Sequence, residues 1–336
     1  MISEDPANAG RPVGRGSARS RAAAKVSSLT LRQLSAVLPP ERAWGLWLSR
    51  QIVAGIMNTF GPSLAQTTVE AVDEHLPDGR RIVGEWVRGP GVGSTADTAA
   101  AIYFLHGSGY AMCSPRTHRR LTGWLSRLTG LPVFCVDYRL APQHPFPTDA
   151  DDTHTGWDWL TAECGLRPDH LVVAGDSAGG HLAVDLLLHS PTPPRPAAMV
   201  LFSPLADLTF ATAQAREQLR PDPAIRAADA ARLVQLYSGA IDPTHPRLAH
   251  DIIGAPAFPP TLIQAGGAEM LAADAHLLAT AIRAGGGACE LQVWPYQVHV
   301  FQALPRLAPE ATAAMRYAAR FITESLGSTI APAKAG

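Results

Sequence analysis

A serine lies among small residues in the run Gly175-Asp176-Ser177-Ala178-Gly179-Gly180. The apolar residues 171–174 before it predict a buried strand, and residues 181–188 after it predict a helix. A serine on a tight strand-to-helix turn exposes its hydroxyl above the sheet, and only small neighbours fit around it. The pattern is typical of a nucleophile, so we expect Ser177 to attack a substrate.

A serine hydroxyl is a weak nucleophile and needs a base within hydrogen-bond reach, oriented by a third group. Only His276 and His299 of the twelve histidines follow Glu269 in the chain. His276 falls inside an expected helix with apolar neighbours, whereas His299 follows the last expected strand in a loop. That loop reaches the catalytic edge of the sheet, so we expect His299 to be the base.

Two carboxylates are candidates for the acid that orients this base. Glu269 lies in a loop just beyond the strand that ends near Gln264, at the same sheet edge. Asp274 lies about one turn into the next helix, where a carboxylate near a helix N-terminus has a structural reason to exist. We favour Glu269 and keep Asp274 as the alternative.

A second motif, His106-Gly107-Ser108-Gly109-Tyr110, directly follows the expected strand at 99–105. Backbone amides at such a turn, with the amide after the nucleophile, can donate hydrogen bonds to the oxygen that becomes charged in a tetrahedral intermediate. We expect an oxyanion hole formed by Gly107, Ser108, Gly109 and Ala178.

Strands and helices alternate along most of the chain and must position these residues. An expected hairpin at 67–75 and 82–87 precedes apolar strands near 99–105, 132–137, 171–174, 198–202, 261–264 and 289–294. Near-continuous apolar strands separated by helices predict an α/β protein with a mostly parallel sheet covered on both faces.

The domain prediction has three parts. Residues 1–28 are expected to be a flexible tail and residues 29–66 to form N-terminal cap helices. Residues 67–328 are expected to form the catalytic domain, with a Pro-rich insertion near 207–260 that contains one helix-like run. Insertion and N-terminal helices together are expected to cover the carboxyl edge of the sheet, where ligands bind in such folds.

Three stretches together resemble the bacterial hormone-sensitive-lipase family of esterases (family IV), a branch of the α/β-hydrolase superfamily. They are residues 106–109, residues 137–142 (Asp-Tyr-Arg-Leu-Ala-Pro) and the run around Ser177. The resemblance covers about residues 67–326. It implies an α/β-hydrolase fold with a helical cap, and hydrolysis of carboxylic esters through an acyl-serine intermediate without a cofactor or a metal.

Two departures from the family pattern concern the site. Ser108 replaces a family glycine, and a Cβ at positive φ costs about 1–2 kcal/mol. The family acid is usually the first residue of an Asp-Pro-Leu triplet, and here the stretch Glu269-Met270-Leu271 takes that place.

We expect short to medium acyl esters as substrates. The same residues leave open lactone, amide or carbamate hydrolysis, acyl transfer, and a catalytically silent ligand-binding protein on the same fold.

Charge and patterning limit the partners. The chain has 336 residues with 28 basic and 29 acidic side chains, so the formal net charge of -1 argues against a nucleic-acid partner. We expect the partner to be a small-molecule ester.

The N-terminus lacks the apolar stretch of a secretory signal, so we expect a cytoplasmic protein. Residues 44–60 predict an amphipathic helix rather than a membrane span. Its Trp44, Trp47 and Phe60 either line the acyl pocket or pack within the cap. A peripheral membrane contact and a homodimer stay open.

Overall fold

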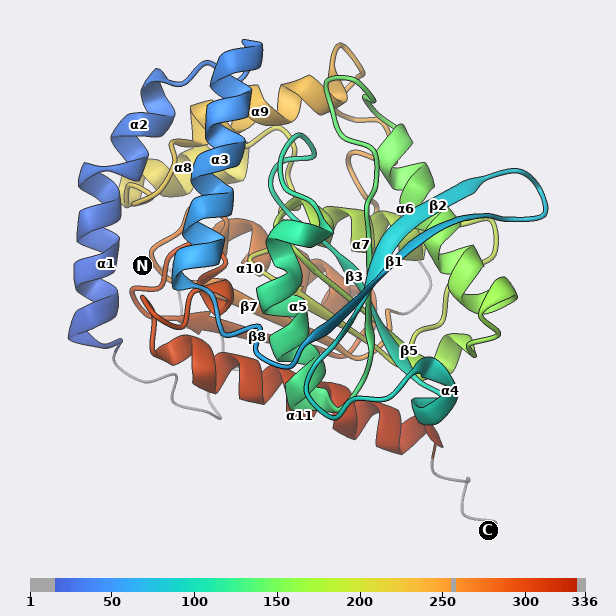
Figure 1. Ribbon diagram of the computed structural model, residues 1–336. Coiled ribbons are helices and arrows are strands. Elements are labelled where there is room, and N and C mark those ends of the chain that lie inside the picture. The colour runs from blue at the N-terminus through green and yellow to red at the C-terminus, as the bar shows by residue number, and fades with distance from the viewer. Residues whose placement is uncertain (1–15, 255–257, 331–336) are drawn as a thin grey trace.

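A single eight-stranded sheet forms the centre of the protein, as seen in the computed structural model, which describes residues 16–254 and 258–330 (Figure 1). The strand order is β1-β2-β4-β3-β5-β6-β7-β8. The strands are β1 (Thr68–His75), β2 (Arg81–Arg88), β3 (Ala101–Leu105), β4 (Val133–Val136), β5 (Leu171–Asp176), β6 (Ala198–Phe202), β7 (Thr261–Gly266) and β8 (Cys289–Trp294). β1 pairs antiparallel with β2 and β2 antiparallel with β4, and all other pairs are parallel. The predicted mostly parallel sheet is confirmed.

Helices cover both faces of this sheet. One apolar core contains side chains of α5 (Pro115–Thr129) and α11 (Glu310–Ile330). The other contains side chains of α6 (Thr148–Asp158), α7 (Ala178–His189) and α10 (Ala272–Ala284). Alternate residues of β3 enter opposite cores, which is why the central strands are apolar without interruption. Single-turn elements lie at α4 (Thr95–Thr98), Trp159–Glu163, Pro168–His170 and Phe301–Ala303.

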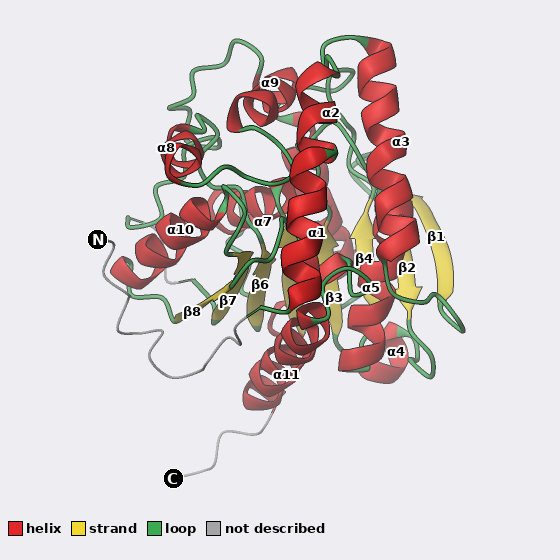
Figure 2. Ribbon diagram, turned by 90° about the vertical axis from the view of Figure 1, so that its left-hand side faces the viewer, coloured by secondary structure: helices red, strands yellow, loops and turns green. Residues whose placement is uncertain are grey.

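Five further helices gather at one end of the sheet (Figures 1 and 2). They are α1 (Ala18–Leu29), α2 (Leu31–Val37), α3 (Ala43–Phe60), α8 (Ala211–Leu219) and α9 (Ala227–Ser238). The first three precede the sheet in sequence, and the last two belong to the insertion between β6 and β7. The insertion therefore contains two helices where the sequence predicted one.

The flexible tail expected over residues 1–28 is wrong for its last part, because α1 begins at Ala18. Its N-cap Ser17 accepts a hydrogen bond from the Ser20 amide, and the Glu310 carboxylate of α11 accepts one from the Ser20 hydroxyl at 2.6 Å. Alanine has a high helix propensity, and a short helix becomes stable when another element packs against it. Composition alone does not show which element that is. Residues 1–15 lie outside the described residues.

Candidate active site

Ser177 lies at the sharp turn between β5 and α7. Its φ of 52° and ψ of −120° are strained for a residue with a Cβ, which is typical of functional positions. The turn brings backbones so close that a Cβ at Gly179 would lie 2.0 Å from the Leu105 carbonyl oxygen. A Cβ at Gly175 would lie 2.6 Å from the Gly179 carbonyl oxygen. These contacts explain why the serine is flanked by glycines.

His299 lies next to this serine and Glu269 lies next to His299, although each is at least 92 residues from Ser177 in sequence. The Nε2 atom of His299, in the loop after β8, lies 3.0 Å from Ser177 Oγ. Its Nδ1 atom lies 2.5 Å from Glu269 Oε2. The other carboxylate oxygen of Glu269 accepts a hydrogen bond from the Gly266 amide at 2.6 Å. In this order of contacts the imidazole can take the proton of Ser177 while the carboxylate holds the ring in the required tautomer.

The environment of His299 adjusts its basicity. Burial lowers the pKa of the ring, but the charge and hydrogen bond of Glu269 outweigh burial and raise the pKa above its usual value. A higher pKa makes the ring a stronger proton acceptor, which suits a general base.

Asp274, the alternative acid, lies elsewhere. Its Oδ2 atom accepts the amides of Ala206 at 2.8 Å and Asp207 at 2.9 Å, so the carboxylate fixes the chain after β6. Burial raises the pKa of Asp274 to about 7. Its carboxylate thus has a structural task, and the contact to His299 belongs to Glu269.

The four residues expected to form an oxyanion hole differ in what their amides do. The Gly107 amide donates to Asp176 Oδ1 at 3.1 Å, so it is not available to a substrate oxygen, contrary to expectation. Among the described residues, no partner is found for the amides of Ser108, Gly109 and Ala178. Ser108 and Gly109 line the same pocket as Ser177, which leaves these three amides as candidate donors.

Ser108 adopts φ of 88°, the left-handed region that favours the glycine usual in the family. Its hydroxyl accepts a hydrogen bond from the Cys113 thiol, with 2.9 Å between Oγ and Sγ. The serine side chain is thus held beside the pocket at the cost of backbone strain.

A cavity of about 340 Å³ opens at Ser177 and His299. Its wall is largely apolar and comes from α1, α2, α3 and α9, with Leu31, Ile52, Ile56, Leu233 and Val234 among its residues. Trp44 and Trp47, 58% and 61% exposed, neither line this cavity nor pack within the cap. Phe60 packs on the core beside α5 and α11 instead.

Two residues of the insertion hold the loop that carries Glu269, and sequence analysis missed both. Arg216 of α8 donates to the carbonyl oxygens of Glu269 at 2.8 Å and Gly267 at 2.9 Å. Asp222 accepts the Met270 amide at 2.7 Å. Arg216 lies on α8 and Asp222 in the loop after it, and no local sequence pattern indicated their contacts with the loop after β7.

Comparison with known proteins agrees with this geometry. The profile of a family described as alpha/beta hydrolase fold matches residues 102–303. The chain is 35% identical to the carboxylesterase/phospholipase LipF of Mycobacterium tuberculosis, over 81% of this chain and 73% of LipF. It is 36% identical to the esterase LipU of the same organism, over 78% of this chain and 89% of LipU.

Solved structures give the same result. The esterase EstE5 soaked with p-nitrophenyl butyrate superposes with a TM-score of 0.78 at 29% identity, over 93% of this chain and 99% of that one. An esterase of the bacterial hormone-sensitive lipase family superposes with a TM-score of 0.76 at 27% identity, over 97% of this chain and 100% of that one. The chain therefore belongs to the hormone-sensitive-lipase (family IV) branch of the α/β-hydrolases and is a carboxylesterase-type serine hydrolase.

Proposed function

We propose that this hydrolase cleaves short to medium acyl esters with Ser177 as nucleophile, His299 as base and Glu269 as the orienting acid. The observation that carries the proposal is the unbroken chain of contacts from Ser177 Oγ through His299 to Glu269, at a largely apolar cavity. The imidazole takes the serine proton as Oγ attacks the ester carbonyl, and the tetrahedral oxyanion forms. The oxyanion accepts hydrogen bonds from the backbone amides of Ser108, Gly109 and Ala178.

Collapse of the intermediate expels the alcohol, which receives the proton from the imidazolium, and leaves an acyl-serine. Water, deprotonated by His299, then attacks the acyl group, and the carboxylic acid leaves as Ser177 regains its proton. The protein residues thus return to their starting state, and no cofactor is needed for the balance.

The cavity supports the choice of acyl length. Its volume of about 340 Å³ lies at the low end of the usual range for small-molecule pockets, roughly 300–1,000 Å³. A largely apolar wall favours an alkyl chain over a polar or charged acid. We therefore expect turnover to be highest for short chains and to fall toward palmitate.

The experiment compares the wild type with Ser177→Ala on p-nitrophenyl esters from acetate to palmitate. The variant should lose about 10⁴-fold or more in kcat, because members of such a triad act as a unit. Ester hydrolysis by Ser177→Ala at the wild-type rate would refute the assignment of the nucleophile. Adding an alcohol and measuring transesterification separates hydrolysis from acyl transfer.

A peripheral membrane contact through α1–α3 is the second part of the proposal. Six large apolar side chains are exposed there: Val26, Leu29, Leu34, Val37, Trp44 and Trp47. α1 also carries three basic and no acidic residues, which complements an anionic lipid surface. Within the described residues, no helix combines the length and the apolar character of a membrane span.

Flotation with vesicles of phosphatidylserine and phosphatidylcholine tests this contact. The wild type should float with the vesicles, and a Trp44→Ser/Trp47→Ser double variant should float less. If both proteins stay in the unbound fraction to the same extent, the proposal is contradicted. A homodimer that covers this face would instead appear as a doubled mass in light scattering, lost in the double variant. Fractionation of the producing cells tests the predicted cytoplasmic location.

A further inference from the structure

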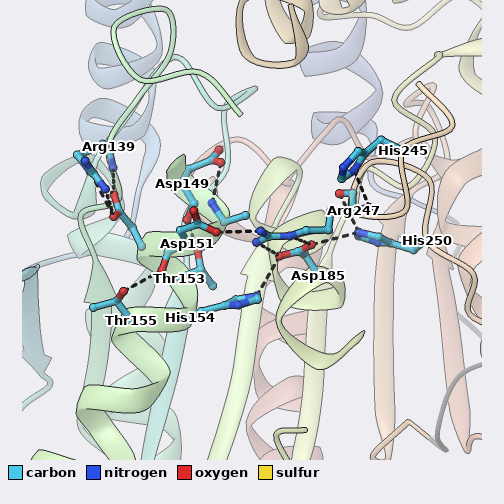
Figure 3. A network of polar contacts seen from close by, with 12 residues as sticks. Arg139, Asp149, Asp151, Thr153, His154, Thr155, Asp185, His245, Arg247 and His250 are labelled. Carbon is cyan, nitrogen blue, oxygen red and sulfur yellow. Dashed lines mark hydrogen bonds and ion pairs between the residues drawn. The ribbon is translucent and has the colours of Figure 1, made fainter. Parts of the chain in front are cut away.

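A buried carboxylate with several histidines lies away from the active site, on the part of α7 that follows the nucleophile (Figure 3). Asp185 accepts hydrogen bonds from Arg247 Nε at 3.0 Å and Nη2 at 2.9 Å. His154 Nε2 lies 3.0 Å from Oδ2 of the same carboxylate. A carboxylate has about four lone-pair positions, so three are occupied. The fourth lies on Oδ1, which is 3.8 Å from His250 Nε2. That nitrogen also lies 3.2 Å from the Arg247 carbonyl oxygen, so binding an ion there requires the ring proton to move to Nδ1.

His189 supplies a second imidazole. It follows Asp185 by four residues on α7, and side chains at this spacing share a helix face. Its Nε2 atom is buried, and no described residue offers it a hydrogen-bond partner. In the neutral tautomer that carries its proton on Nδ1, the ring offers this nitrogen as a ligand.

The ligand atoms of Asp185, His189 and His250 lie within 4.8 Å of one another. On a tetrahedral zinc ion with bonds near 2.1 Å, ligand atoms are about 3.4 Å apart. Small side-chain rotations, which shorten the longest separation by at most about 1.4 Å, therefore close the group around an ion.

We propose that Asp185, His189 and His250 form a structural binding site for a divalent transition-metal ion, with zinc the best match. Two imidazoles and one carboxylate are ligands that zinc accepts, and water completes the tetrahedron. Arg247 and His154 hold the carboxylate in position through its other lone pairs, as outer partners do in metal sites.

The electrostatics are compatible with a cation. Arg247, which pairs with Asp185, also donates from Nη1 to Asp151 Oδ1 at 2.8 Å. Two carboxylates therefore face one guanidinium, which leaves a net charge of one negative unit. A bound cation would offset that charge.

The site would connect α7 with the end of the insertion between β6 and β7. Asp185 and His189 belong to the helix behind the nucleophile, and His250 belongs to the end of the insertion that contributes to the cap. An ion would tie the insertion to α7 without taking part in ester chemistry. The sequence predicted no metal because none of its four cysteines is paired as C-x-x-C.

The test uses the full chain without a histidine tag, stripped with EDTA and dialysed. Zinc chloride is titrated calorimetrically, cobalt chloride is followed by visible absorption, and melting is measured with and without one equivalent of zinc. His189→Gln and His250→Gln are compared with His75→Gln, an exposed histidine at the end of β1. We expect one zinc per chain, a rise in Tm, and affinity at least about tenfold weaker in the two cluster variants only.

His189→Gln is the variant least apt to disturb folding, because His189 is only half-buried near the end of α7. Its metal-free melting curve and ester hydrolysis show whether it is folded, and neither depends on the ion. Absence of stoichiometric zinc binding would overturn the proposal. So would equal affinity in all variants, or loss of binding in His299→Gln, which would place the ion at the active site.

Discussion

Replacing Glu269 with glutamine tests the acid assignment most sharply. The Gly266 amide donates to Oε1, so it requires an acceptor at that position in the variant as well. The glutamine carbonyl oxygen would occupy that place, and its NH₂ group would face His299 Nδ1. A donor there forces Nδ1 to accept and moves the ring proton to Nε2. The ring then presents N–H to Ser177 and cannot take its proton.

The magnitude follows from this tautomer change. An amide in place of the orienting carboxylate costs about 10⁴-fold in kcat, or about 5 kcal/mol in the barrier. We expect Glu269→Gln to lose about that factor on p-nitrophenyl butyrate, with melting close to the wild type because the shape is conserved.

The matched control is Asp274→Asn. Its amide oxygen can still accept the two backbone amides of Ala206 and Asp207, and its NH₂ group takes the place of Oδ1, which has no partner among the described residues. We expect activity within about tenfold of the wild type, since no contact to His299 is lost. Equal losses in the two variants, or near-normal activity in Glu269→Gln, would refute the reasoning.

The pH profile gives an independent readout of the same pair. His299 acts as a base only when neutral, so activity should fall as pH drops through its pKa, which Glu269 holds above the usual value. Removing the carboxylate charge lowers that pKa, so the acid limb of residual activity in Glu269→Gln should move to lower pH. A limb that moves to higher pH would contradict the electrostatic account.

Three further changes test the turn, the motif and the cavity. Gly179→Ala should fail to fold or lose several degrees of Tm, because its Cβ would lie 2.0 Å from the Leu105 carbonyl oxygen. The control Gly55→Ala on α3 has open space around the new Cβ, so its free energy of unfolding should rise by roughly 0.5–1 kcal/mol. Ser108→Gly should raise stability by about 1–2 kcal/mol in denaturant unfolding, because φ of 88° suits glycine; an unchanged midpoint would show that the strain is absorbed elsewhere. Ile56→Trp should narrow the cavity and lower the longest acyl chain accepted, while Trp47→Ala, outside the cavity, should leave the chain-length profile unchanged.

Local pattern predicted the elements and the residues that depend on them. The elbow around Ser177 could be recognised because a tight turn admits few residue types, and those types are contiguous in sequence. The position of His299 after the last strand followed from strand order alone. The flexible tail was predicted wrongly because the contact between Ser20 and Glu310 joins residues 290 apart.

The sequence by itself determined the fold class, the family and the chemical groups available at the carboxyl edge of the sheet. Those features depend on periodicity and on short motifs, which are local in the chain. Only the tertiary structure decided which amides are free, since the Gly107 amide is taken by Asp176, 69 residues away. It also decided that Glu269 rather than Asp274 contacts His299, and that Asp185, His189 and His250 lie together. Such contacts are set by the packing of distant segments, and no local pattern encodes that packing.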